Sequence, residues 1–513
     1  MLSFSPIPVQ YINTFNIKTL STRLFSSMTS ITHQIATKAS EVRALKLAGI
    51  IKSDLAPHIA ELLALKASLS PPPAPLAATF PPSSYARKPF FHQEILHQST
   101  KSSARVTRIT TPHGSFLTPS FVAVATNGAI KGVTIDAVKE EKQDLMFCNS
   151  YHLLLQPGPD VIAGAGGIHK FMGMREGTTM GPIITDSGGF QVFSLRYGTV
   201  FEDLKEETSS GSFSDSKDSL AKPKAELKRA SVRPSTQEAR GNSTKPAVTV
   251  TEEGVVFRSY RDGVMVPLTP ESTIQAQKKY GSDIIIPLDE LPSYGVTGAG
   301  LKASVDLTHR WEARSLQEHL KDINSKQGEG QAIYGIVHGG VDKDLRKYSV
   351  EYITSLPFDG FCIGGSLGGN REEMLDMLKF VMPLVKESEK LPGQYNKPVH
   401  LLGIADEPSI LAAAPLGIDT FDSCFPTRLA RHGTLLTSKG RLHIKSAKYS
   451  KQYGVPIDEG CDCRACSVHD RAYMNHLLRA REPVFLELAT RHNIKHMNRV
   501  MEQLRDDIMN DKV

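Results

Sequence analysis

The sequence lacks the features that mark membrane-spanning and disulfide-stabilised proteins. No stretch reaches about 18 apolar residues without a charged or turn-forming residue, so we expect no membrane span. Six cysteines in 513 residues are too few for a disulfide framework, which predicts a reducing compartment such as the cytoplasm. The formal net charge of +6 permits a polyanionic partner but does not require one. With 40% hydrophobic and 22% charged residues, most of the chain should be globular.

Acidic residues are absent from the first forty positions, where Lys18, Arg23 and Lys38 are scattered among Ser, Thr and Phe. Such a segment is typical of organelle transit sequences, and equally of disordered tails. Both interpretations stay open, so the cytoplasm is the expected location and mitochondrial association is the alternative.

Short apolar runs that end in polar or glycine-rich residues recur along the chain, and several precede amphipathic helical patterns. Continuous apolar strands that alternate with helices indicate a parallel sheet. Eight runs predict an α/β fold, a (β/α)₈ barrel with its chemistry at the C-terminal ends of the strands. The eight runs are Phe121–Ala125, Leu145–Ser150, Pro182–Asp186, Ile284–Asp289, Ile333–His338, Gly360–Gly365, His400–Ile404 and Ile418–Asp422.

Composition divides the chain into five predicted parts. Residues 1–89 form an N-terminal extension with helical periodicity and a proline-rich linker, and residues 90–205 form the first part of the barrel. Residues 206–246 are rich in Ser, Thr, Lys and Glu, which predicts a disordered insertion. The barrel continues over 247–440. Residues 441–513, where three cysteines lie within six positions and suggest a bound metal, form a zinc-binding subdomain with C-terminal helices.

Three aspartates stand at the ends of predicted strands: Asp186, Asp289 and Asp422. One such aspartate is commonplace, and Asp186 or Ser187 could simply cap the helix that follows. Three at one barrel mouth suggest chemistry, because a carboxylate can attack an acetal-like carbon while a second one moves protons. Holding a metal ion is the alternative role.

The residues after Asp186 suggest a site for a flat ligand. Gly188 and Gly189 have no side chains to cover the backbone, so a planar group could approach the peptide N–H groups and stack on Phe190.

Farther along, Arg428 and Arg431 follow the last strand. They could bind phosphate, or they could be a solvated pair on a loop.

The cysteines Cys461, Cys463 and Cys466 form a C-x-C-x₂-C cluster. Three thiols this close in a reducing compartment usually bind zinc, and a tetrahedral structural site needs a fourth ligand. Spacing does not choose among the candidate histidines, which are His469, His476, His492 and His496.

Together these motifs resemble the tRNA-guanine transglycosylase family. The resemblance rests on "TDSGGFQVFSL", "PLTPESTIQAQKKYGSDI", "GIDTFDSCFPTRLARHG" and the cysteine cluster with a later "HN". It covers the chain from about Phe90 to the C-terminus, without the 206–246 insertion. It implies an irregular (β/α)₈ barrel with a zinc subdomain, and makes His492 the fourth zinc ligand.

The resemblance also implies roles for individual residues. Asp422 would be the nucleophile that attacks C1′ of the wobble guanosine in a tRNA anticodon loop, and Asp186 the general acid/base. The base would be bound by Ser187, Gly188, Gly189, Phe190, Asp289, His338, Gly365, Gly368 and Leu402. The anticodon loop would be held by Gly403, Ile404, Ala405, Asp406, Glu407, Pro408, Ser409, Thr427, Arg428, Leu429, Ala430 and Arg431.

Three positions depart from the family pattern. His338 stands where the family usually has Gln, so its ring would offer a donor and an acceptor in a fixed geometry. Ser366 and Asn370 replace the usual Leu and Glu, which removes a carboxylate that would favour a cationic aminomethyl base. Gly368 replaces a bulkier Val and should open room beside the base, which resembles the eukaryotic branch that inserts free queuine.

The function implied is the exchange of guanine for queuine at position 34 of tRNAs with GUN anticodons, those for Asp, Asn, His and Tyr. The main alternative is a catalytically silent tRNA-binding subunit of the same complex, but such paralogues tend to lose the nucleophile. An archaeal-type enzyme that acts elsewhere on tRNA is a third interpretation. The resemblance implies either a homodimer or a heterodimer with a non-catalytic paralogue.

Overall fold

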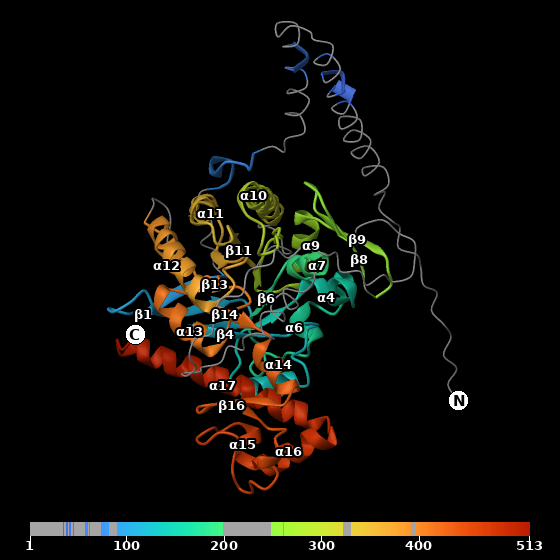
Figure 1. The fold of residues 1–513 in the computed structure, drawn as a ribbon. Coiled ribbons are helices and arrows are strands. Elements are labelled where there is room, and N and C mark those ends of the chain that lie inside the picture. The colour runs from blue at the N-terminus through green and yellow to red at the C-terminus, as the bar shows by residue number, and fades with distance from the viewer. Residues whose placement is uncertain are drawn as a thin grey trace, which may run out of the picture. The chain divides into compact units, whose positions relative to one another are not determined.

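The computed structural model describes residues 90–197, 248–259, 261–321, 330–390 and 396–513, together with 73–81 and a few positions between 34 and 61. The chain divides into two units, Met1–Pro73 and Ala74–Val513, and the second contains the barrel (Figure 1). The predicted insertion at 206–246 and most of the N-terminal extension lie outside the described residues. None of the described helices is both long and apolar enough to span a membrane.

Eight parallel strands form a closed barrel, which confirms the predicted fold class. The strands follow one another in chain order, and the barrel closes where the last strand pairs with the first, Phe421 lying opposite Phe121. All eight predicted runs supply a strand. The strands are β4 (Ser120–Val124), β5 (Met146–Cys148), β6 (Ile183–Thr185), β10 (Ile284–Ile285), β11 (Ala332–Val337), β12 (Gly360–Ile363), β13 (Val399–Leu401) and β14 (Thr420–Ser423).

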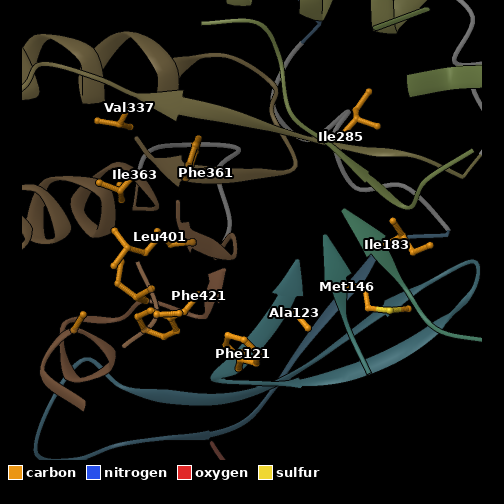
Figure 2. Packing of buried hydrophobic residues seen from close by; sticks show 14 of the residues in the cluster. Phe121, Ala123, Met146, Ile183, Ile285, Val337, Phe361, Ile363, Leu401 and Phe421 are labelled. Carbon is orange, nitrogen blue, oxygen red and sulfur yellow. The ribbon is translucent and has the colours of Figure 1, made fainter. Parts of the chain in front are cut away.

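Side chains of these strands alternate between two hydrophobic clusters, as the two-residue period of a strand requires. Phe121, Ile363 and Phe421 belong to the larger cluster, which also contains the buried faces of the surrounding helices (Figure 2). Val122 and Cys362, one position away from two of these, belong to a smaller inner cluster. Polar residues at inward positions near the strand ends therefore face the barrel mouth.

Helices connect the strands around the outside of the barrel (Figure 1). They are α3 (Ile135–Glu140), α4 (Ser150–Leu155), α5 (Pro159–Gly164), α6 (Ile168–Phe171), α7 (Gly189–Tyr197), α9 (Pro270–Tyr280), α10 (Gly298–Lys321), α11 (Lys343–Ser355), α12 (Arg371–Ser388), α13 (Glu407–Ala413) and α14 (Phe425–Arg431). The "PLTPESTIQAQKKYGSDI" motif encodes α9. Thr269 and Ser272 form a capping box at its start, and Gly281 ends it in the left-handed conformation.

An antiparallel sheet precedes the barrel and covers the N-terminal ends of its strands. Its strands are β1 (His92–Gln98), β2 (Arg105–Thr111) and β3 (Gly114–Thr118). Ile109 and Phe116 of this sheet belong to the inner cluster of the barrel. His113, in the turn between β2 and β3, contacts Asp283, which directly precedes β10.

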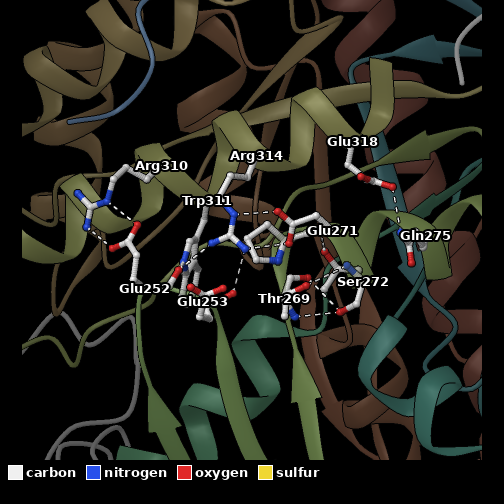
Figure 3. A network of polar contacts seen from close by, with 12 residues as sticks. Glu252, Glu253, Thr269, Glu271, Ser272, Gln275, Arg310, Trp311, Arg314 and Glu318 are labelled. Atoms are coloured by element: carbon white, nitrogen blue, oxygen red, sulfur yellow. Dashed lines mark hydrogen bonds and ion pairs between the residues drawn. The ribbon is translucent and has the colours of Figure 1, made fainter. Parts of the chain in front are cut away.

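A second antiparallel sheet contains β7 (Val248–Val250), β8 (Val255–Arg258) and β9 (Met265–Leu268). It begins just after the predicted insertion and is held by arginines of α10 (Figure 3). Arg310 forms a bidentate pair with Glu252 at 2.7 and 2.8 Å, and Arg314 a bidentate pair with Glu271 at 2.8 Å. The sheet is thereby fixed to α9 and α10.

The C-terminal region contains a β-hairpin, β15 (Thr434–Thr437) and β16 (Gly440–His443), and the helices α15 (Arg464–Val468), α16 (Arg471–Ala480) and α17 (Val484–Met509). Short 3₁₀ turns complete the fold at Ala77–Thr79, Ala414–Leu416 and Ala447–Tyr449. The hairpin and the helices share a hydrophobic cluster that includes all three cysteines of the predicted zinc site. α17 also packs against β2, β4 and α14, so it joins this region to the barrel.

Candidate active site and metal centre

The predicted site residues meet at the C-terminal ends of the barrel strands. Asp186 follows β6, Asp289 follows β10 and His338 follows β11, while Asp422 lies in β14. Since parallel strands all point the same way, residues distant in sequence are brought to one mouth.

The carboxylate of Asp422 is anchored through one oxygen. Its side chain is mostly buried, and Oδ1 accepts hydrogen bonds from the Gly403 backbone N–H at 2.7 Å and from His400 Nε2 at 3.0 Å. No described residue donates to Oδ2. The arrangement leaves one carboxylate oxygen available for a substrate.

Asp186 is half-buried beside α4 and α7. It accepts hydrogen bonds from Asn149 Nδ2 at 2.9 Å, from the Ser150 backbone N–H at 2.6 Å and from Gln191 Nε2 at 3.5 Å. Burial raises the pKa of the Asp186 carboxyl to about 6, although these donors lower it, and the charge of Asp422 adds to the rise. A carboxyl that titrates near neutral pH suits proton transfer in both directions.

Asp186 does not cap the helix that follows it, which was the alternative left open by the sequence. Among the described residues its hydrogen-bond donors are the Asn149 side chain, the Ser150 backbone N–H and the Gln191 side chain of α7, rather than a backbone N–H of α7. Ser187 is buried, and its hydroxyl accepts from the Gly189 backbone N–H at 3.3 Å.

The two glycines after Ser187 have steric reasons to lack a side chain. Gly188 has a φ of +84°, and a Cβ there would lie 2.8 Å from the backbone nitrogen of Tyr151. A Cβ at Gly189 would lie 3.4 Å from Asp289 Oδ1, so that oxygen faces the glycine segment. Phe190 is 51% exposed at the start of α7 and is therefore free to stack on a planar ligand.

Asp289 and His338 form a pair, with His338 Nε2 only 2.7 Å from Asp289 Oδ2. The backbone N–H of His338 donates to Ser349 Oγ at 3.0 Å. The opposite ring nitrogen, Nδ1, would lie 3.0 Å from a Cβ at Gly365, so Gly365 gives the ring its space. His338 therefore uses one of its two polar atoms on Asp289, and only Nδ1 remains for a ligand.

An open cleft of about 260 Å³ adjoins this pair. His338 and residues 340–342 after β11, Gly365 and Ser366 after β12, the loop after β10 and the start of α10 line it. The guanidinium of Arg346, buried under the cleft, donates to the carbonyls of Val337, Gly340, Gly364 and Ser366 at 2.8 to 3.0 Å. Arg346 thus fixes the two loops that carry His338 and Gly365.

The space expected beside Gly368 is occupied. A Cβ at this position would lie 2.5 Å from Glu373 Cβ, because α12 turns back over the glycine. Glu373 Oε2 accepts hydrogen bonds from the Gly369 backbone N–H at 2.8 Å and from the Tyr294 hydroxyl at 3.0 Å. Asn370 caps α12 by accepting from the Glu373 backbone N–H at 2.9 Å. A carboxylate thus lies close to the position where the family's glutamate is replaced.

A second cluster combines Cys461, Cys463, Cys466 and His492, all buried. The sulfur atoms lie 3.9, 3.5 and 3.3 Å from His492 Nδ1, in that order. His492 Nε2 is 2.7 Å from the Leu436 carbonyl oxygen, which requires the proton on Nε2 and leaves the Nδ1 lone pair facing the thiols. This donor set fits a tetrahedral zinc ion.

The structure thus distinguishes among the four histidines that spacing left open. His469 stacks on Tyr473, and His496 Nε2 lies 3.2 Å from Glu407 Oε2. Neither these two nor His476 belongs to the cysteine cluster. A second group of possible metal ligands among the described residues contains His113, His169 and Asp283.

That second group fits a metal poorly. The two imidazole rings stack with centroids 3.6 Å apart and an angle of 18°, so their in-plane lone pairs cannot meet at one ion. Each ring nitrogen instead faces one oxygen of Asp283, at 2.9 and 3.1 Å. The group is therefore a hydrogen-bonded cluster that joins the β2–β3 turn and α6 to the start of β10, at the N-terminal end of the barrel.

Comparison with known proteins places this geometry in a family. The family described as queuine tRNA-ribosyltransferase matches residues 99–219 and 235–513. The chain is 47% identical over 424 residues to the queuine tRNA-ribosyltransferase of Protochlamydia amoebophila (strain UWE25), which covers 83% of this chain and 97% of the relative. It is 42% identical over 424 residues to the queuine tRNA-ribosyltransferase of Chlamydia pneumoniae, and this match covers 82% of this chain and 99% of the relative. This chain belongs to the queuine tRNA-ribosyltransferase family.

Family membership confirms the resemblance seen in the motifs, while the similarity to the eukaryotic branch stays a prediction.

The segments that the family resemblance assigns to RNA flank the mouth. Asp406 caps α13 by accepting from the Ser409 backbone N–H at 3.3 Å, and it also pairs with Arg371 at 2.9 Å. Arg431, at the end of α14, forms no ion pair with a described residue.

The "HN" signature of the family gains a physical explanation. Asn493, next to His492, donates to the Pro426 carbonyl at 2.9 Å and to the Thr434 carbonyl at 3.1 Å, and accepts from the Leu436 backbone N–H at 2.9 Å. These contacts join the cysteine–histidine cluster to α14, the helix that carries Arg428 and Arg431.

Several residues of the site were not identified from the sequence. They are His400, Asn149, Gln191, Arg346, Tyr294 and Glu373. His400 begins one of the predicted strand runs, and an inward position on a barrel strand was the available signal. Asn149 and Tyr294 act across 37 and 79 residues, which a motif does not record. Gln191 lies within the quoted "TDSGGFQVFSL" segment and Glu373 only four residues after Gly369, so both were within reach of the sequence.

Proposed function

We propose that this chain is a queuine tRNA-ribosyltransferase that replaces the wobble guanine of tRNAs for Asp, Asn, His and Tyr through a covalent Asp422–ribose intermediate. The observation that carries the proposal is the pair of unlike carboxylates at the mouth. Asp422 has one anchored and one free oxygen, while the pKa of Asp186 is raised to about 6 by burial.

Each carboxylate suits one part of the exchange. Asp422 attacks C1′ of the ribose as the C1′–N9 bond breaks, and the electron pair leaves with guanine. Protonated Asp186 gives its proton to the departing base. The resulting carboxylate then takes a proton from N9 of the incoming base, whose attack on C1′ releases Asp422 and restores the starting state.

The base is bound between Phe190 and Leu402. Asp289 Oδ1 faces the glycine segment, where it can accept from the N–H groups of a guanine-like base, and His338 holds the other carboxylate oxygen. Queuine carries a cationic aminomethyl arm, which the 260 Å³ cleft has room to receive. Glu373 at the edge of this region supplies the negative charge that Asn370 lacks.

Zinc, where bound, would be held by Cys461, Cys463, Cys466 and His492 and would supply structural cross-linking rather than chemistry at the mouth. We expect about one zinc per chain in the purified protein, from the four-ligand set. Cys463→Ala should lose the metal and weaken tRNA binding, because Asn493 couples the cluster to α14. Elemental analysis and filter binding measure both effects; His469→Ala is the control and should keep its zinc.

The alternative of a silent tRNA-binding subunit is disfavoured because Asp422 and Asp186 are both present and face the same mouth. We propose activity in the cytoplasm or in association with mitochondria, as a homodimer or with a non-catalytic paralogue. The Ser- and Thr-rich insertion and most of the N-terminal extension lie outside the described residues, so these proposals rest on the sequence.

The deciding experiment is incorporation of labelled guanine and queuine into tRNA, with and without a candidate partner subunit. Wild type should also give an RNA-linked protein band on denaturing gels, and Asp422→Asn should give none. A band of wild-type intensity in the mutant would show that another residue is the nucleophile. Incorporation of neither base by wild type, alone or with the partner, would favour the silent subunit.

A further inference from the structure

The buried imidazole of His400 is held between two residues of the neighbouring strand. His400 lies on β13 and is 0% exposed. Its Nε2 is 3.0 Å from Asp422 Oδ1, and its Nδ1 is 2.8 Å from Thr420 Oγ1. Thr420 and Asp422 are two positions apart on β14, so both side chains point to the inside of the barrel.

The hydrogen-bond pattern determines which ring nitrogen carries the proton. An ionised carboxylate can only accept, so His400 Nε2 must donate to Asp422. In the neutral ring Nδ1 then accepts from the Thr420 hydroxyl. Phe147 stacks on the ring from β5, with centroids 6.1 Å apart and an angle of 17°. The imidazole is therefore fixed in position, orientation and tautomer.

We propose that His400 is a positioning residue for the nucleophile. Together with the Gly403 backbone N–H, it occupies Asp422 Oδ1 and so presents Oδ2 to the ribose. This inference rests on the proposed nucleophilic role of Asp422, and it assigns that role to one oxygen.

The covalent step is consistent with this division of the two oxygens. A bond forms between Oδ2 and C1′ while the C1′–N9 bond breaks, and the base leaves with the electron pair and the Asp186 proton. Oδ1 then becomes the carbonyl oxygen of the ester, which still accepts from His400 and Gly403. His400 keeps the same contact before and after the step, and it need not touch the substrate.

Two substitutions separate positioning from packing. The amide nitrogen of Gln reaches about as far from the backbone as His Nε2, whereas that of Asn reaches only about as far as Nδ1. His400→Gln should therefore keep a donor to Asp422 Oδ1, and His400→Asn should lose it. Both variants remove the ring that stacks on Phe147, so a packing role predicts similar losses for both.

The measurement is the rate at which the RNA-linked band forms in a single turnover with saturating tRNA. We expect His400→Asn to be about 10- to 100-fold slower than wild type, and His400→Gln to be within a few-fold of it. The Kd for tRNA should change little in both. Equal losses in the two variants, or no loss in His400→Asn, would overturn the proposal.

Thermal melting of each variant shows whether the comparison is made on folded protein. Should His400→Asn fail to fold, Thr420→Val provides the second test, because it removes the hydroxyl that holds Nδ1. Its rate should fall several-fold with an unchanged Kd for tRNA, and an unchanged rate would overturn the proposal. Absence of any band in the wild type would instead count against the proposed function itself.

Discussion

Aspartates at the two ends of the barrel have the same side chain but opposite environments. At the N-terminal end, Asp283 accepts from both His113 and His169 and from the backbone N–H groups of His113 and Ile183. These partners hold the pKa of the Asp283 carboxyl well below its usual range, against the effect of burial. At the mouth, the pKa of Asp186 is raised to about 6.

Asp419 repeats the pattern of the N-terminal end. Arg105 donates to both of its oxygens at 2.9 and 2.7 Å, and the Val399 backbone N–H donates at 2.8 Å. Asp422, only three residues later, keeps an oxygen to which no described residue donates a hydrogen bond. A carboxylate with all its acceptor sites satisfied contributes stability, whereas one left partly unsatisfied is available for chemistry.

The largest expected effect tests this contrast directly. Asp422→Asn should reduce the rate of intermediate formation by at least about 10³-fold, because an amide is a poor nucleophile. Its free energy of unfolding should stay within about 1 kcal/mol of wild type, since the amide oxygen can still accept from Gly403. Single-turnover assays and urea unfolding measure the two quantities, and a rate within tenfold of wild type would contradict the assignment.

The converse substitutions at the N-terminal end should affect stability. Asp419→Asn and Asp283→Asn each remove a buried charge and leave donors facing an amide NH₂, so we expect a loss of about 3–5 kcal/mol in the free energy of unfolding. The folded fraction should keep its rate of exchange. Urea unfolding of each variant measures the loss. If the free energy of unfolding falls by less than about 1 kcal/mol, the aspartates at the N-terminal end are not specifically stabilising, and the contrast with Asp422 fails.

The contribution of Asp186 to stability should change with pH in the opposite direction to that of Asp283, because its pKa is raised rather than lowered. Its folded pKa of about 6 exceeds the ordinary value of 3.8, so the folded state binds more protons between these values and stability falls as pH rises through that window. Asp186→Asn should remove this fall and stabilise the protein at pH 8 by about 1–3 kcal/mol relative to wild type. Thermal melting at pH 4 and pH 8 is the measurement, and equal stability of both proteins at pH 8 would contradict it.

The smallest expected effect concerns Glu373, whose carboxylate is exposed. Glu373→Gln keeps the contacts to Gly369 and Tyr294 but removes the charge, so queuine use should fall only a few-fold, in line with ~0.2–1 kcal/mol for exposed ion pairs. Guanine exchange should not change, because guanine has no cationic arm. Side-by-side incorporation of the two bases measures this, with Glu372→Gln as the control; equal loss of both would exclude a role in selectivity.

The space beside Gly368 could not be predicted from the sequence. Comparison of side-chain size predicts that a glycine opens space, but α12 fills the position with Glu373. Gly368→Val would therefore displace Glu373 and strain a backbone with a φ of +123°, and should impair both bases. Whether a glycine borders a cavity depends on a helix that begins after it.

The sequence by itself determined the eight strand runs and the ligand-rich C-terminal segment, because each of these depends on residues close together in the chain. The number of runs and the helical patterns between them also predicted the barrel, although its closure joins strands far apart in sequence. It also placed Asp186, Asp289 and Asp422 at strand ends, and parallel strands bring their ends together. The spacing of the cysteines left four histidines open, the family resemblance pointed to His492, and the structure places His492 against the thiols. Only the tertiary structure decided which oxygen of Asp422 is free and why Asp186 titrates near neutral pH. These properties arise from contacts such as His400 with Asp422 and Asn149 with Asp186, whose distances and directions are set by packing.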